Sequence, residues 1–374
     1  MDPPSHALAG ALLGRALPAA KRGPAATLTV TVAAVLPDAD VFFQPFVRGP
    51  FPLLSVHRGF THSLLGVAVM APLVALVLWR TGRDNNYWRL TALAALGQLS
   101  HIFLDLCTSW GTMVFYPFSR ARVAWDVLFI IDFAFSSILL FPQLLAWVYR
   151  DPNGALRRGV RLWLALVPLT AALVGLSPLV FRAPYDWPLL AILLAAEAAL
   201  LAAPAARGWG FRQSPARFCR MGLAVLTLYV SFCATAHQRA LRQVEMFAES
   251  HALRVESRAA LPAPLSPFLW SGLVGTPDGV YQNWFSLLDP GPPRLASFPS
   301  APENDFIARA RTLPEVKVYL WFARFPVVAY REEAERRVVE FTDLRFRAPY
   351  RRNPFLLRVV FGAQGEVLSV GFGQ

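Results

Sequence analysis

The sequence has few charged residues. Only 16% of its 374 residues are Asp, Glu, Lys or Arg, whereas 55% are hydrophobic. Water-soluble domains carry about 25% charged residues, so this composition excludes an ordinary soluble domain. The sequence therefore predicts a polytopic membrane protein that is mainly α-helical.

Cysteine is scarce as well. Cys107, Cys219 and Cys233 lie in or beside apolar segments. Their number and placement exclude a disulfide framework and a structural thiolate metal site. We interpret them as small hydrophobic residues packed between helices.

A basic stretch before the first apolar run is also missing. Asp2 stands there instead, and Lys21 and Arg22 follow the run. A secretory signal has the opposite order, so none is expected.

What the sequence does have is a series of long apolar segments. Two shorter ones come first, 5–20 and 25–36, and their lengths fit either short spans or a hairpin that dips into the membrane and returns. The six longer segments approach the roughly 20 residues that cross a bilayer. They are 61–79, 90–107, 127–148, 162–181, 188–203 and 221–236.

The net charge of +12 is distributed unevenly between the connecting loops. Basic residues concentrate in alternate loops, which the positive-inside rule places in the cytoplasm. The loops rich in basic residues contain Lys21, Arg22, Arg80, Arg83, Arg89, Arg150, Arg157, Arg158, Arg161, Arg207, Arg212, Arg217 and Arg220. The loops poor in basic residues contain Arg48, Arg58, Arg120, Arg122 and Arg182. We therefore attribute the net positive charge to the topology in the inner membrane. We expect the lipid bilayer, and not nucleic acid, as the partner.

The composition changes after residue 238, where acidic residues and prolines become frequent. Segments 316–322, 337–346 and 355–361 favour strands, the last in a hairpin with 366–372, and 303–313 favours a helix. We therefore predict a transmembrane domain over 1–238 and an extracytoplasmic α+β domain over 239–374.

Histidine and aspartate residues interrupt the apolar N-terminal half, where ionisable groups are costly and usually functional. His101 and Asp105 are four residues apart, on one face of a helix. Asp38 and Asp40 follow a proline at a helix end, and His57 and His62 flank the start of the next helix, which Thr61 or Ser63 can cap. The predicted topology brings all of them, with His6, to the outer side.

These residues predict a metal site with up to seven ligands. The candidates are His6, Asp38, Asp40, His57, His62, His101 and Asp105. Imidazole and carboxylate ligands suit a divalent metal, zinc in first place, with manganese or iron as alternatives. The set fits two ions, or one ion with surrounding groups that orient its ligands. Arg58 adds a cation suited to an oxyanion.

Each part also has a structural interpretation. A single His6 is as compatible with an interfacial residue as with a ligand, and Asp38 and Asp40 could simply form a helix stop. His101 and Asp105 could hydrogen-bond two helices together. Convergence of all these residues on one membrane face favours the metal site.

The motifs resemble a known family. His6, then LPDAD at 36–40, HRGFTHS at 57–63 and HIFLDLCTSWG at 101–111 are similar to the bacterial membrane-bound metal-dependent hydrolases, also described as LexA-binding inner-membrane hydrolases. The resemblance covers about residues 1–135. It implies that the family's motif positions are His6, Asp38, Asp40, His57, Arg58, Thr61, His62, His101, Asp105, Thr108 and Asp132. The ligand order is more faintly similar to zinc-dependent phospholipase C and P1-type nucleases, but a second His-x-x-x-Glu is missing.

The leading hypothesis is hydrolysis of a phosphoester- or amide-containing amphiphile at the outer membrane surface. His62, His101, Asp105 and one of Asp38 or Asp40 would hold the metal, and the other aspartate would take a proton from water. Arg58 would stabilise the developing negative charge. The alternatives are a metal or proton transporter, and a non-catalytic membrane scaffold with a structural metal.

Overall fold

A computed structural model describes residues 1–18, 23, 25–181, 187–264, 266–289, 291–347 and 355–373. Ala20, Lys21, Arg22 and Arg182, which entered the predictions above, lie outside these residues.

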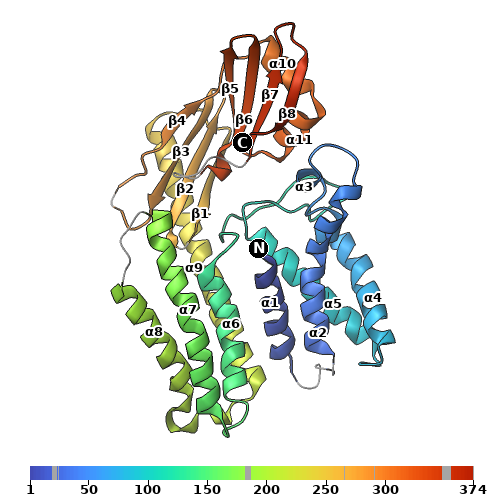
Figure 1. The fold of residues 1–374 in the computed structure, drawn as a ribbon, viewed down its shortest axis with the longest axis vertical. Coiled ribbons are helices and arrows are strands. Elements are labelled where there is room, and N and C mark those ends of the chain that lie inside the picture. The colour runs from blue at the N-terminus through green and yellow to red at the C-terminus, as the bar shows by residue number, and fades with distance from the viewer. Residues whose placement is uncertain are drawn as a thin grey trace.

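The N-terminal two thirds of the chain is a bundle of helices that run roughly side by side (Figure 1). The helices are α1 (Pro3–Ala16), α2 (Ala26–Val35), α4 (Leu64–Arg80), α5 (Tyr87–Leu106), α6 (Phe133–Val148), α7 (Ala155–Phe181), α8 (Trp187–Ala202) and α9 (Pro215–Ser250). Short turns join them, namely η2 (Leu36–Phe46), α3 (Pro52–Ser55), η3 (Phe60–His62), η4 (Ala203–Gly208) and η5 (Gly210–Arg212). The predicted mainly helical fold is confirmed.

Several helices are long and apolar enough to cross a membrane. Among the described residues these are Ala26–Phe46, Trp187–Gly208 and Pro215–Ser250, and the pair Pro52–His62 and Leu64–Arg80, bent by 66°, makes a fourth if it is one span. Large apolar side chains such as Val77 and Leu228 are exposed on the outer surfaces of the helices, as contact with lipid requires. Of the two short apolar segments, α2 with η2 reaches spanning length, whereas α1 has 14 residues.

The C-terminal region contains two four-stranded antiparallel sheets, each with its strands in sequence order. The first sheet consists of β1 (Ser257–Ala263), β2 (Ser266–Thr276), β3 (Gly279–Ser286) and β4 (Ala296–Pro299), and the second of β5 (Pro326–Glu333), β6 (Arg336–Asp343), β7 (Leu356–Phe361) and β8 (Val367–Phe372). The helix α10 (Asp305–Thr312) and the hairpin of β7 with β8 confirm two predictions.

One predicted strand is wrong. Residues 316–322 form the helix α11 (Pro314–Phe322). Pro314 and Glu315 occupy its first turn, where proline and an acidic side chain favour a helix start. Val316, Tyr319 and Phe322 are buried at a spacing of three, which is helical rather than alternating. The strand predicted over 337–346 ends at Asp343, where the turn η6 (Leu344–Phe346) begins.

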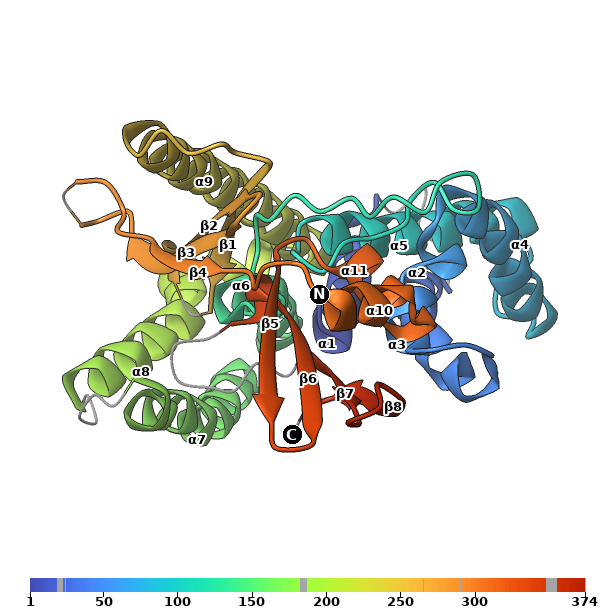
Figure 2. The ribbon, with the colours of Figure 1, turned by 90° about the horizontal axis from the view of Figure 1, so that it is seen from above.

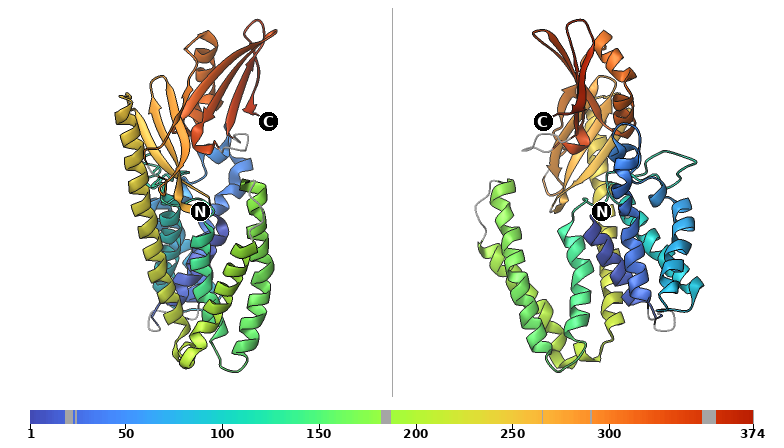
Figure 3. Two further views of the ribbon diagram at one scale, coloured as in Figure 1. Left: turned by 90° about the vertical axis from the view of Figure 1, so that its left-hand side faces the viewer. Right: turned by 45° about the vertical axis from the view of Figure 1, so that its right-hand side comes forward.

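Helix α9 connects the two parts of the chain. It crosses residue 238 without a break and continues along the first sheet (Figure 3). Ala240, Val244 and Phe247 on its last turns pack against Trp270 of β2. The first sheet is therefore fixed to the end of a membrane helix.

The second sheet and its helices contact α3 and the segment that follows α5. From above, α10 and α11 lie over α1 and α3 (Figure 2). Leu54 of α3 is 1% exposed and belongs to the same hydrophobic core as Tyr319 and Phe361, and Trp110 packs against that core. The turn between η2 and η3 is thereby held in place by the C-terminal region.

Two glycines allow α1, α2 and α5 to pack closely. A Cβ on Gly10 would lie 2.8 Å from the Cβ of Ala34, and one on Gly97 would lie 2.5 Å from the carbonyl oxygen of Val30. Only glycine, which has no Cβ, permits the helices to approach this closely. The close approach brings the carboxyl end of α2 against the polar face of α5.

Candidate metal centre

Asp38 and Asp40 lie just beyond the end of α2. Pro37 stands at the start of η2, where proline is tolerated because the first N–H groups of a helix need no intrahelical partner. The 3-10 turn directs Asp38 towards α5 and Asp40 towards the segment 57–62. The side chain of Asp38 is 15% exposed.

The segment 57–63 forms a tight turn before α4. Arg58 has a φ of 62°, a left-handed conformation that is uncommon for a residue with a side chain. Ser63 caps α4 by accepting a hydrogen bond from the N–H of Gly66. Of the two predicted caps, Ser63 has this role, and Thr61 is free to contact the polar cluster.

His101 and Asp105 occupy the last turns of α5 on one face, as their spacing predicts. Both are fully buried, and the Nε2 of His101 is 3.4 Å from Oδ2 of Asp105. The Nδ1 of His101 is 2.7 Å from the carbonyl oxygen of Ala34 on α2.

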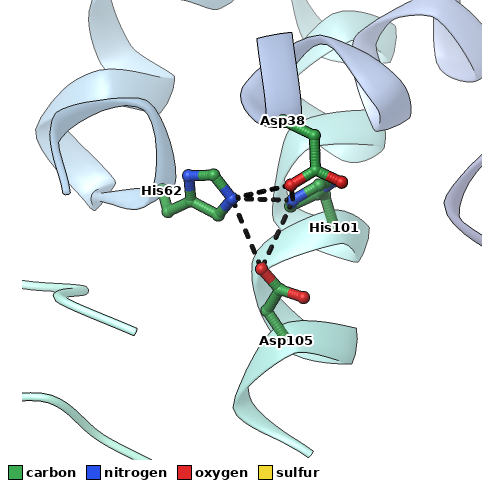
Figure 4. Close-up of side chains that lie close together, drawn as sticks. All are labelled: Asp38, His62, His101 and Asp105. Carbon is green, nitrogen blue, oxygen red and sulfur yellow. Dashed lines mark hydrogen bonds and ion pairs between the residues drawn. The ribbon is translucent and has the colours of Figure 1, made fainter. Parts of the chain in front are cut away.

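Asp38, His62, His101 and Asp105 converge on a single point (Figure 4). The Nε2 of His62 is 3.0 Å from the Nε2 of His101, 3.3 Å from Oδ1 of Asp38 and 3.3 Å from Oδ2 of Asp105. The Nε2 of His101 is also 3.5 Å from Oδ1 of Asp38. Three separate elements thus contribute to one compact group of four ligand atoms.

Hydrogen bonds fix the tautomers of both imidazoles. A carbonyl can only accept, so Nδ1 of His101 carries the proton that it donates to Ala34. Thr61 donates its hydroxyl proton to Oδ2 of Asp40 at 2.9 Å, so its oxygen accepts from Nδ1 of His62 at 2.8 Å. In both neutral rings Nε2 therefore holds a lone pair directed at the cluster.

With both rings neutral, the site contains four acceptors and no donor between them. Two imidazole lone pairs and two carboxylate oxygens repel one another unless a cation lies among them. A tetrahedral zinc ion, with bonds of about 2.0–2.1 Å, separates its ligand atoms by about 3.3 Å. The observed separations of 3.0–3.5 Å match this value. The four residues therefore fit a divalent metal.

Asp40 and His57 form a neighbouring group that shares His62. Nδ1 of His57 donates to Oδ1 of Asp40 at 2.8 Å, and the backbone N–H of Arg58 donates to Oδ2 at 3.3 Å. Donors and acceptors are matched here, so hydrogen bonds account for this group without an ion. Asp40 holds the imidazole of His62 through Thr61, as the carboxylates behind metal-binding histidines do.

Arg58 and His6 contact the cluster through Asp105. Nη2 of Arg58 is 2.9 Å from Oδ1 of Asp105, and Nη1 donates to Thr108 at 3.1 Å. His6 on α1 stacks on His101 with ring centroids 3.6 Å apart, and its Nε2 is 3.3 Å from Oδ1 of Asp105. Both lie beside the four-atom group and not within it.

Other polar residues have structural partners elsewhere. Asp132 caps α6 and accepts a hydrogen bond from Tyr229, so it lies outside the cluster. Glu197 accepts a hydrogen bond from Thr170 at 2.5 Å between α7 and α8. Figure 1 shows α8 on the opposite side of the bundle from α5.

Two contributions to the site were not predicted from the sequence. The Ala34 carbonyl is a backbone atom whose position depends on the close packing at Gly97, and no sequence signal points to it. The sequence indicates the hydroxyl of Thr61 only as a helix cap or as a position of the family motif. Its place directly before His62 puts it within reach of Nδ1.

Fold and site together define an integral membrane protein with a buried His/Asp cluster. Residues 1–180 match the model of a family described as YdjM inner membrane protein. The chain is also similar to the uncharacterised protein YfhP of Bacillus subtilis (strain 168), 27% identical over 131 residues that cover 33% of this chain and 39% of YfhP. The matched region is thus well under half of that relative. No solved structure is significantly similar. The family match and the candidate spans support an inner-membrane protein that contacts the lipid bilayer.

Proposed function

We propose that this protein is a metal-dependent hydrolase of the inner membrane, with one divalent ion, zinc in first place, held by Asp38, His62, His101 and Asp105. The observation that carries the proposal is the meeting of four acceptor atoms without a donor at separations that suit a tetrahedral ion. Buried charges and lone pairs of this kind are not retained without compensation.

The metal, when bound, supplies Lewis acidity and lowers the pKa of a water molecule that it holds. Arg58 keeps Asp105 ionised by direct contact and fixes the direction of its carboxylate. Ala34 and Thr61 hold the two imidazoles in the tautomer that a metal requires.

The proton acceptor is best assigned to His57. The sequence suggested whichever of Asp38 and Asp40 does not bind metal, but Asp40 already accepts from His57, Thr61 and the N–H of Arg58. His57 donates Nδ1–H to Asp40, and its Nε2 makes no hydrogen bond within the described chain. An oriented imidazole with a free Nε2 is a suitable general base.

The position of the site suggests the class of substrate. Asp38 is the only one of the four ligands whose side chain is partly exposed, at 15%. Phe42, Phe43 and Phe46 on the same turn η2 are strongly exposed, as expected where a protein meets lipid. An amphiphile with a phosphoester or amide group could therefore reach the site from the membrane.

We also infer that the site and the C-terminal region face the outside of the inner membrane. The chain alternates between the two ends of the bundle, and the basic loops after α4, α6 and α8 lie at the end away from the sheets (Figure 1). The positive-inside rule places those loops in the cytoplasm. Fusion of alkaline phosphatase or a fluorescent protein to the C-terminus tests this, because the first is active only outside and the second fluoresces only inside.

A structural metal is the second candidate function. Four protein ligands fill a tetrahedron, as in structural zinc sites, whereas catalytic sites usually have three. Cobalt-substituted protein separates the two. If the visible spectrum of the cobalt protein changes when an anion is added, the ion has a coordination position that can exchange. A tetrahedral spectrum that does not change with anions indicates a structural ion.

Hydrolysis itself is tested with the detergent-purified, metal-loaded full chain on chromogenic phosphodiesters, phosphomonoesters and amides. We expect turnover that chelation abolishes and added metal restores. His57→Gln should lose at least about 100-fold in rate while keeping its metal. The control is His237→Gln, since His237 on α9 contacts Trp270 and lies outside the cluster. Equal rates for both variants would contradict the role of His57.

A further inference from the structure

A basic cavity lies where the segment after α5 meets the second sheet. It has a volume of about 180 Å³. Its lining includes Arg120, Arg122, Arg324, Arg345, Trp110 and Trp321. The cavity therefore joins the end of the helical bundle to the C-terminal region, beside the metal centre and separate from its ligands.

Only half of the arginines in this cavity have an acidic partner. Both Nη atoms of Arg324 donate to Asp126, at 2.9 and 2.8 Å, and Arg345 pairs with Asp343 at 2.7 Å. Arg120 and Arg122 form no ion pair with any residue that the structure describes. The lining thus carries two positive charges without a counter-charge.

These two arginines share one aromatic ring. The guanidinium of Arg120 lies 4.9 Å from the ring centroid of Trp321, and that of Arg122 lies 5.0 Å from it. Burial lowers the pKa of Arg122, and so do the nearby charges of Arg58, Arg345 and Arg120. An anion between the guanidinium groups would relieve this repulsion.

Two hydrogen-bond donors of the same lining lack acceptors. The indole N–H of Trp110 and the Nε–H of Arg122 are buried without a partner in the described chain. A buried donor left unpaired destabilises the fold, so each such group calls for an explanation. An oxyanion would supply the missing acceptors as well as the missing charge.

We propose that this cavity binds a phosphate group, either as inorganic phosphate or as the monoester headgroup of a lipid. Arginine suits phosphate because its planar fork donates to two oxygens at once. Arg120 is exposed, so a phosphate carried on a larger molecule can enter on that side. The proposal does not depend on catalysis at the metal centre.

The cavity is linked to the metal centre through Arg122. Its Nη2 donates to the carbonyl oxygens of Leu54 and His57, at 2.7 and 3.0 Å, and Nη1 donates to Gly111 at 3.0 Å. A phosphate on Arg122 would therefore also steady the turn that carries His57.

The first test compares two single-charge variants of the full chain in detergent. Arg120→Gln removes a guanidinium that makes no hydrogen bond in the described residues, and Arg294→Gln removes an exposed arginine next to β4 as the control. Thermal unfolding is followed with inorganic phosphate, and with chloride at equal ionic strength. We expect a phosphate-specific rise in Tm for wild type and Arg294→Gln, and about tenfold weaker apparent affinity for Arg120→Gln.

The second test identifies the source of the phosphate. Native mass spectrometry with phosphatidic acid, and with diacylglycerol as the phosphate-free control, measures lipid retained by each variant. A lipid headgroup is identified if wild type retains phosphatidic acid, if Arg120→Gln weakens this retention about tenfold, and if added phosphate displaces the lipid. A response to inorganic phosphate alone identifies the free anion.

Two more variants distinguish a loss of phosphate binding from a loss of the fold. Arg120→Lys keeps the charge and should restore most of the affinity, and Trp110→Phe keeps an aromatic ring but removes the unpaired indole N–H and should weaken binding. If neither probe distinguishes Arg120→Gln from Arg294→Gln, or if wild type responds to neither, the proposal is wrong.

Discussion

His62 and His101 place their Nε2 atoms 3.0 Å apart, although each ring directs its Nδ1–H at an acceptor on the other side. Two neutral imidazoles in this arrangement cannot hydrogen-bond to each other. A proton on one ring or a metal ion between the two rings would remove the repulsion of the lone pairs, and the nearby oxygens of Asp38 and Asp105 complete the set of four ligands that suits a metal.

The hydroxyl of Thr61 should contribute to metal affinity without touching the metal. Thr61→Val removes the bridge between Asp40 and Nδ1 of His62 while preserving the shape of the side chain. Loss of a group behind a metal ligand typically weakens binding about 10–100-fold. Competition with a fluorescent chelator measures this. Thr91→Val, which removes only a bond to the Tyr87 carbonyl on α5, should leave the affinity unchanged.

Gly97 should be essential for the fit of α5 against α2. A Cβ at this position would lie 2.5 Å from the Val30 carbonyl oxygen, so Gly97→Ala must separate the helices. We expect a loss of about 1–3 kcal/mol in stability from overpacking, and weaker metal binding because the Ala34 bond to His101 is disturbed.

Gly159→Ala is the matched control for that experiment. Gly159 lies in α7, and a Cβ there would meet its nearest neighbour, Val148, at 3.8 Å. Alanine in an open helical position should be neutral or stabilising by up to about 1 kcal/mol. Thermal unfolding of both variants in the same detergent provides the comparison. Similar destabilisation of the two would contradict the packing argument.

Arg324 and Asp126 should couple the C-terminal region to the segment before α6. Burial alone would lower the pKa of Arg324, but the hydrogen bonds that Arg324 donates to Asp126 raise it, so this contact stabilises the charged guanidinium. Asp126 has a φ of 56°, which asparagine also tolerates, so Asp126→Asn changes the charge with little backbone strain.

A double-mutant cycle with Arg324→Gln and Asp126→Asn measures this coupling. We expect about 1–2 kcal/mol for a bidentate, partly buried pair. Faster proteolysis between the two parts should accompany each single variant. A coupling near zero would contradict a role of this pair in holding the C-terminal region.

The site residues were more predictable than the C-terminal fold. His101 and Asp105 could be paired from helical spacing alone, and the topology brought Asp38 and His62 to the same end. The separation of Asp38 from Asp40 into different roles was not predictable, because it depends on the 3-10 geometry of η2 and on a hydrogen bond from Thr61.

The error at residues 316–322 has a similar cause. Val316, Val318 and Tyr319 have strand-forming side chains, but burial against the second sheet selects the helical face of α11. No individual strand of the first sheet was predicted. In β1, Ala259, Ala260 and Leu261 have little strand preference and are fixed by pairing with β2. Tertiary packing overrides local preference in both places.

The most direct measurement is the metal content of the detergent-purified full chain by mass spectrometry. We predict about one equivalent of a transition metal, after purification or after reconstitution with zinc or manganese, in wild type and in His237→Ala and His251→Ala, whose histidines lie outside the cluster. His101→Ala and Asp105→Asn should lose it. Wild-type protein that stays metal-free after reconstitution, or a His101→Ala variant that retains its metal, would contradict the account.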